Sequence, residues 1–147
     1  MRSSLAVAAP PARALLIYDG DCSICSLCVR RWQKTTGAHL DYLPFQDPGV
    51  ARRFPEVPRG QFQTAVQLIE PDGRVYGGAV AVLRALAQGP RRARLLNWYE
   101  RWPLFARAAE WTYRLVARHR RFFAALTRLA WGAAHRSFDK PGRRASV

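Results

Sequence analysis

The sequence predicts an α/β domain followed by a helical extension, and three observations lead to this fold class. The chain has 147 residues, 49% of them hydrophobic, which is enough to fill one core. Short apolar runs bounded by Gly, Pro and Asp alternate with helical patterns up to residue 90, and beyond it apolar residues recur at helical spacing among arginines. We expect a flexible tail over residues 1–13, a core over 14–90, a basic amphipathic helical extension packed on the core over 91–138, and a flexible tail over 139–147.

The core begins with a strand, a turn and a helix. Ala14–Tyr18 is a continuous apolar run, the pattern of a strand buried on both faces. Asp19-Gly20 supplies a sharp turn, and Asp21 suits the N-cap of the helix that follows. The helical pattern runs from Cys22 to about Thr35 and ends before a glycine.

The rest of the core predicts three more strands and one helix. His39–Phe45 is a short second strand, and the proline-containing segment Val50–Phe62 is a loop or a single helical turn. Thr64–Ile69 and Arg74–Tyr76 form a hairpin, and Ala79–Ala87 is a helix. The order β-α-β-β-β-α, with one parallel crossover followed by a hairpin and a helix, predicts a thioredoxin-like core.

The extension combines an apolar stripe with a strong positive charge. From residue 91 onward there are 14 basic and 3 acidic residues, within a chain of net charge +14. Pro103 suits a first helical position, and either one long helix or two packed helices fit the pattern. The favoured interpretation is a solvated polar face over a core-packing stripe that includes Leu104, Phe105, Ala108, Trp111, Leu115 and Val116. Docking on an anionic membrane surface or an acidic protein is the alternative, and nucleic acid is the least favoured partner.

All three cysteines lie within seven residues, at Cys22, Cys25 and Cys28. An odd, local cluster does not fit the disulfide framework of a secreted protein and indicates a reactive or metal-binding site in a reducing compartment. No secretory signal is evident, and no apolar run approaches the roughly 20 residues that span a bilayer. We therefore expect a cytoplasmic protein.

Two cysteines three residues apart at a helix start are suited to dithiol chemistry. Their Cα atoms are then roughly 5–6 Å apart, which a disulfide accepts. The helix N-terminus favours the thiolate of Cys22, the expected nucleophile, and Cys25 one turn deeper suits the resolving role. Such a Cys22–Cys25 disulfide needs no bound cofactor. Cys28, on the apolar face, is expected to pack as a small hydrophobe.

Two carboxylates beside Cys22 bear on its chemistry. Asp19 and Asp21 oppose the helix dipole and disfavour the thiolate, which favours a reducing over an oxidising couple. Asp19 suits either of two roles: a general acid/base in catalysis, or a structural residue that stabilises the turn through backbone hydrogen bonds.

Metal binding or inert thiols remain the alternative for the cysteines. A structural zinc site takes four ligands, and the three histidines of the chain, His39, His119 and His135, lie at no ligand-like spacing from the cysteines. On that alternative, the protein is a basic binding module without enzymatic activity.

Three segments resemble the DCC-family thiol-disulfide oxidoreductases, whose motif is Asp-x-x-Cys-x-x-Cys. They are Tyr18-Asp19-Gly20-x-Cys22-x-x-Cys25, the stretch from Pro71 to Ala81, and Tyr113 to Arg120 with His119 in place of the usual Asn. The resemblance covers roughly residues 14–122 and implies a thiol-disulfide oxidoreductase acting on protein or small-molecule disulfides or thiols. It implies Asp19, Cys22 and Cys25 as the functional set.

The third predicted strand departs from the wider thioredoxin pattern. Thioredoxins place a cis-proline just before this strand, whereas Gln63-Thr64 stands there in this chain. The substrate-docking surface is therefore expected to differ from that of thioredoxin.

Overall fold

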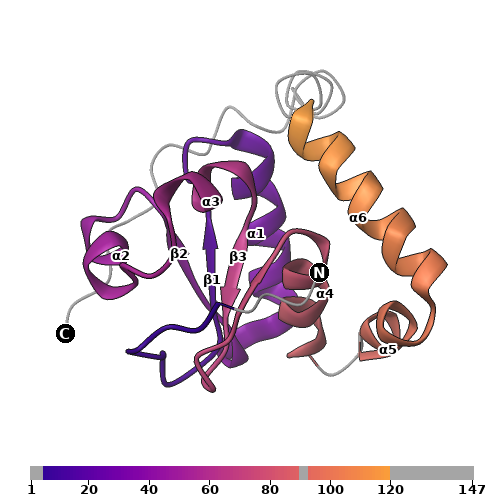
Figure 1. Ribbon diagram of the computed structural model, residues 1–147, viewed down its shortest axis with the longest axis horizontal. Coiled ribbons are helices and arrows are strands. Elements are labelled where there is room, and N and C mark those ends of the chain that lie inside the picture. Colours follow the sequence, from indigo (N-terminus) through magenta and orange to yellow (C-terminus); the bar gives the residue numbers. More distant parts are fainter. Residues whose placement is uncertain (1–4, 90–92, 120–147) are drawn as a thin grey trace.

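The computed structural model describes residues 5–89 and 93–119 (Figure 1). The predictions for the end of the extension and for the C-terminal tail lie outside these residues. Within them, no helix is long and apolar enough to span a membrane.

A four-stranded mixed sheet forms the centre of the fold, with strand order β2-β1-β3-β4. The strands are β1 (Leu15–Tyr18), β2 (Asp41–Pro44), β3 (Gln67–Ile69) and β4 (Val75–Gly77). β1 pairs in parallel with β2 and antiparallel with β3, which pairs antiparallel with β4. One parallel crossover followed by a hairpin confirms the expected α/β, thioredoxin-like fold class.

Within the described residues, six α-helices and a 3₁₀ turn surround the sheet. They are α1 (Ser23–Thr36), η1 (Gly37–His39), α2 (Pro48–Arg53), α3 (Arg59–Thr64), α4 (Ala79–Ala87), α5 (Ala93–Arg101) and α6 (Pro103–Arg118). Figure 1 shows α2 on the opposite side of the sheet from α4, α5 and α6. The helices therefore cover both faces of the sheet.

The connection between β2 and β3 holds two short helices where a loop or a single helical turn was expected. Asp47 caps α2 by accepting a hydrogen bond from the Gly49 N–H at 2.7 Å, and Pro48 occupies the first turn, where a missing N–H costs nothing. Pro58 lies one position earlier relative to α3, as its N-cap residue. The two prolines thus mark helix starts, and α3 includes Thr64, which the sequence pattern assigns to the third strand.

Each face of the sheet carries its own core cluster, because successive residues of a strand point to opposite sides. One cluster, covered by α2 and α3, comprises Val7, Leu15, Ile17, Val50, Phe54, Val57, Phe62, Ile69 and Val75. The other, covered by α4, comprises Ala14, Leu16, Leu40, Val66, Leu68, Tyr76, Val80, Ala81 and Ala85. Burial on both faces explains the uninterrupted apolar run of β1.

The segment before β1 differs from the flexible tail that its composition predicts. The Val7 N–H donates to the Gly73 carbonyl at 2.9 Å, and the Val75 N–H donates to the Leu5 carbonyl at 3.0 Å. Val7 is buried in the first core cluster. These contacts fasten residues 5–7 along β4 and cover the edge of that strand.

The extension begins as two packed helices, α5 and α6, which break at Trp102 with Pro103 in the first turn of α6. α5 packs mainly on α4 and α6. The expected core-packing stripe is wrong in part, because Leu104, Trp111 and Leu115 are exposed. The inward side of α6 instead carries Tyr113, which packs against the second core cluster.

Polar contacts fix which side of α6 faces the core. The Tyr113 hydroxyl accepts a hydrogen bond from the Val66 N–H at 3.0 Å, just before β3. The Glu110 carboxylate accepts from the Val80 N–H at 3.4 Å and from the Tyr99 hydroxyl at 2.9 Å. Because Gly78 caps α4 without a side chain, Glu110 supplies the acceptor that the first turn of α4 lacks.

Candidate active site

The turn between β1 and α1 brings Cys22 to the start of a helix. Cys22 itself is the N-cap of α1, with φ −85° and ψ 109°, and its Sγ accepts a hydrogen bond from the Cys25 N–H at 3.4 Å. The expected cap, Asp21, does not hold this position. Its carboxylate instead accepts from the Gln46 side-chain amide at 3.2 Å.

Both thiols of the Cys22–Cys25 pair lie at the start of α1, with Cys22 at the N-cap and Cys25 three residues later. Both side chains are half-buried. The hydrogen bond to Cys22 Sγ comes from an N–H group that the helix cannot pair internally, and it lies at the positive end of the helix dipole. A thiolate accepts such a bond more strongly than a thiol, so this position favours the reactive form of Cys22.

Cys28 follows one turn deeper and is also half-buried. Burial raises the pKa of the Cys28 thiol, proximity to Cys22 raises it further, and Arg31 lowers it. The raised pKa keeps Cys28 in the unreactive protonated form, which agrees with a packing role.

Asp19 holds the turn together with both its backbone and its side chain. Its carbonyl accepts from the Cys22 N–H at 3.3 Å, and its Oδ1 accepts from the Asp21 N–H at 3.1 Å. Oδ1 also accepts from the Gln46 side-chain amide at 2.7 Å. Asp19 is thus linked to Cys22 through the backbone of the turn.

Gln46 is the residue of this site that sequence reasoning missed. Its Oε1 accepts from the Gly20 N–H at 3.0 Å, while its amide group donates to the carboxylates of Asp19 and Asp21. One side chain therefore contacts three successive residues of the turn before Cys22. The available signal was its place after the strand parallel to β1, because the carboxyl ends of neighbouring parallel strands share one edge of a sheet.

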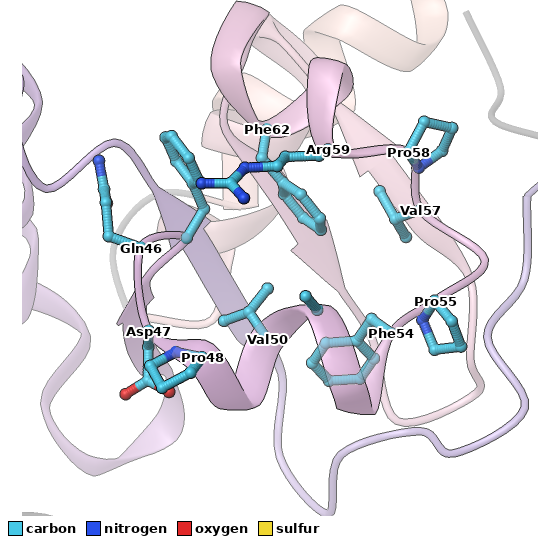
Figure 2. Close-up of a pocket in the computed structure, with 12 residues that line it drawn as sticks. Gln46, Asp47, Pro48, Val50, Phe54, Pro55, Val57, Pro58, Arg59 and Phe62 are labelled. Atoms are coloured by element: carbon cyan, nitrogen blue, oxygen red, sulfur yellow. The ribbon is translucent and has the colours of Figure 1, made fainter.

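A pocket of about 330 Å³ lies between the β2–α2 connection, α2 and α3. Figure 2 shows Arg59 and Phe62 on one side of it and Val50 and Phe54 on the other. Gln46 lines the pocket and also holds the Asp19 turn. The Gln46 side chain therefore links the lining of the pocket to the turn that precedes the dithiol.

No metal site accompanies the cysteines within residues 5–89 and 93–119. No group of three or more His, Cys, Asp or Glu side chains in these ranges could hold a metal ion. His39 and His119 are exposed, and His135 lies outside the described residues.

Comparison with known proteins supports the redox interpretation. The model of the DCC1-like thiol-disulfide oxidoreductase family matches residues 16–125, about three quarters of the chain. Searches of curated proteins and of solved structures gave no significant match. The matched segment contains β1 from Leu16 onward, the turn with its Cys22–Cys25 pair, the other three strands and the helices up to α6. The chain therefore belongs to the DCC1-like thiol-disulfide oxidoreductase family and is an enzyme of thiol-disulfide exchange.

Proposed function

We propose that the enzyme reduces disulfides, with Cys22 as the attacking thiol and Cys25 as the resolving thiol. The observation that carries this assignment is the hydrogen bond from the Cys25 N–H to the Cys22 Sγ at 3.4 Å, at the N-cap of α1. It supports Cys22 as the thiolate of the pair. The spacing of three residues at a helix start supports Cys25 as the thiol that resolves a bond formed at Cys22.

The exchange proceeds in two steps. The Cys22 thiolate attacks one sulfur of the substrate disulfide, which forms a mixed disulfide and releases the other substrate sulfur as a thiolate. Cys25 then loses its proton and attacks the Cys22 Sγ, so that the Cys22–Cys25 disulfide forms and the second substrate thiol leaves. A cellular dithiol reduces the enzyme again and is itself oxidised.

Asp19 is proposed to take the proton of Cys25 during the second step. Its carboxylate accepts from the Asp21 N–H, directly before the start of the helix that carries both thiols, and this position supports the role. The hydrogen bond from Gln46 holds the carboxylate in one orientation, as a general base requires. The same contacts also make Asp19 a brace of the turn, and the two roles are compatible.

The charges near Cys22 support the reducing direction. Asp19 and Asp21 precede Cys22 in the turn, and the Gln46 amide that they share is uncharged. Their negative charge disfavours the thiolate, and a less stabilised dithiol form gives up its electrons more readily. A dithiol of this kind operates in a reducing compartment, which supports the cytoplasm as the site of action.

The pocket beside the turn is proposed to receive the substrate group that adjoins the disulfide. Its wall includes the apolar side chains of Val50, Phe54 and Phe62. It also carries the cation of Arg59 and the carboxylate of Asp47, which accepts from the Gly49 N–H. This lining suits an aromatic or aliphatic group bearing a negative charge, whether on a peptide or on a small molecule.

Equilibration of the enzyme with dithiothreitol buffers, followed by quantification of free thiols, tests the direction. We expect a midpoint more reducing than that of the glutathione couple. A midpoint as oxidising as that of a disulfide-forming enzyme would contradict the proposed direction while leaving the exchange chemistry intact. The Cys25→Ser variant, whose mixed disulfides cannot be resolved, would then capture substrates from cells for identification.

A further inference from the structure

The outward face of α5 and α6 is apolar and cationic at the same time, and we call it the Trp–Arg face. Its apolar members are Trp98, Trp102, Leu104, Trp111 and Leu115, which are the exposed large hydrophobic residues of the part of the chain that the structure describes. Its cationic members are Arg94, Arg101, Arg107, Arg114 and Arg118, all exposed. The exposed fractions reach 75% at Leu104 and 67% at Trp111.

Helical spacing places the members on α6 together. Leu104, Trp111 and Leu115 are separated by seven and four residues, so they lie on one side of this helix. Arg107 follows Leu104 by three residues and Arg114 follows Trp111 by three, which puts both arginines on the same side. The Trp98 ring meets the Phe105 ring edge-on at 6.3 Å, which fixes α5 beside α6. Figure 1 shows α6 at the periphery of the molecule, with no other described element on its outer side.

The charge of this face is uncompensated within the described residues. None of its five arginines forms an ion pair with a residue in these ranges. α5 and α6 contain two acidic residues, and neither offsets the charge. Glu100 pairs with Arg84 at 3.2 Å, and Glu110 is turned inward to Val80 and Tyr99.

We propose that the Trp–Arg face docks on the surface of a bilayer that contains anionic phospholipids. Tryptophan prefers the boundary between headgroups and acyl chains, and leucine adds apolar area below it. The guanidinium fork of arginine matches the phosphate of a headgroup. An acidic protein would account for the arginines, but a lipid surface also accounts for the three exposed tryptophans.

This docking is independent of the redox reaction, because no cysteine lies on α5 or α6. The Cys22→Ser/Cys25→Ser variant is therefore expected to bind membranes as the native chain does. A protein that does not bind membranes can still be a reductase, and a protein without reductase activity can still bind membranes through this face.

Co-sedimentation of the full-length reduced protein with vesicles tests the proposal. The vesicles contain phosphatidylcholine alone or phosphatidylcholine with phosphatidylserine, at low ionic strength. We expect binding to the anionic vesicles, little binding to the neutral ones, and loss of binding as salt is raised. Arg107→Gln/Arg114→Gln should weaken binding on the order of tenfold or more, since each arginine near an anionic surface contributes roughly a fivefold gain in affinity.

Matched variants distinguish binding through this face from binding that depends only on the general positive charge of the chain. Lys34→Gln/Arg52→Gln removes the same charge from exposed positions on α1 and α2 and should leave binding unchanged within about twofold. Trp111→Ala should weaken binding without loss of fold, because the side chain is exposed, and circular dichroism melting verifies the fold.

Three results would overturn the proposal. The first is no binding to anionic vesicles at low salt, and the second is binding that the control pair reduces as much as the α6 variants do. The third is a native dimer that Trp111→Ala converts to a monomer without any vesicle binding, which would assign the face to a second copy of the chain.

Discussion

The side-chain amide of Gln46 donates a 2.7 Å hydrogen bond to the Asp19 carboxylate across the ends of two parallel strands. The same side chain accepts from the Gly20 N–H at 3.0 Å. Gln46 therefore ties the turn that precedes Cys22 to the β2–α2 connection and to the neighbouring pocket.

Gln46→Ala should loosen the turn and slow disulfide exchange. The variant takes away the acceptor of the Gly20 N–H and one of the donors to the Asp19 carboxylate, at a cost of about 1–2 kcal/mol in unfolding free energy. Stopped-flow rates with a small disulfide and urea unfolding measure the two effects. Gln33→Ala, on the exposed side of α1, is the control. Equal exchange rates in native and Gln46→Ala proteins would show that the turn does not depend on this side chain.

Gly20→Ala should destabilise the fold at the same place. An added Cβ would lie 2.9 Å from the Pro44 Cβ and 3.1 Å from the Gln46 Oε1, closer than packed atoms tolerate. We expect a loss of about 1–3 kcal/mol in unfolding free energy. Gly60→Ala is the matched control, because nothing lies within 4 Å of its Cβ and alanine favours the helix by about 0.5–1 kcal/mol. A Gly20→Ala protein as stable as the Gly60→Ala protein would contradict the close packing of the turn.

Tyr99 should titrate at unusually high pH. Burial raises the pKa of Tyr99 to about 12, and the hydrogen bond and charge of Glu110 add to this shift. A raised pKa means that the folded chain holds the phenol proton more tightly than the unfolded chain. The associated stability is therefore complete below the ordinary value of 10.0 and is lost as pH rises towards about 12.

Ultraviolet titration of tyrosine ionisation isolates this group. Subtracting the curve of Tyr99→Phe from that of the native protein should leave a transition near 12, which Glu110→Gln shifts downward. A difference curve centred near 10 would show that Glu110 does not hold the Tyr99 hydroxyl.

Arg59 should select for the charge of small disulfide substrates. Its cation lines the pocket, so Arg59→Gln is expected to raise KM for the anionic aromatic disulfide 5,5′-dithiobis(2-nitrobenzoate) by about threefold to tenfold. KM for the cationic disulfide cystamine should stay level or fall, with kcat little changed for both. Parallel changes for the two substrates would exclude the pocket as the binding place.

Local patterns predicted the elements around the dithiol well. The expected helix from Cys22 to about Thr35 is observed as Ser23–Thr36, and Gly37 follows it with a positive φ of 55°. The capping residue was misplaced by one position, since Asp21 is engaged by Gln46. That contact joins residues 25 apart in the chain, and it arises from the parallel pairing of β1 and β2 rather than from any local pattern.

Periodicity in α6 separated two faces but could not decide which of them turns inward. Tryptophan and leucine suggested the core side by hydrophobicity, yet Leu104 and Trp111 are exposed. The orientation follows from Tyr113 and Glu110, whose polar atoms satisfy backbone N–H groups before β3 and at the start of α4. Such pairings depend on tertiary placement, which the sequence pattern does not contain.

The reversible formation of a Cys22–Cys25 disulfide is the central claim, and intact-mass spectrometry after mild oxidation tests it most directly. The native chain should lose the mass of two hydrogen atoms and regain it on reduction with dithiothreitol. Cys22→Ser or Cys25→Ser should each abolish this change, whereas Cys28→Ser should retain it. A native chain that forms no reversible disulfide, or one that forms it equally well without Cys22, would contradict the account.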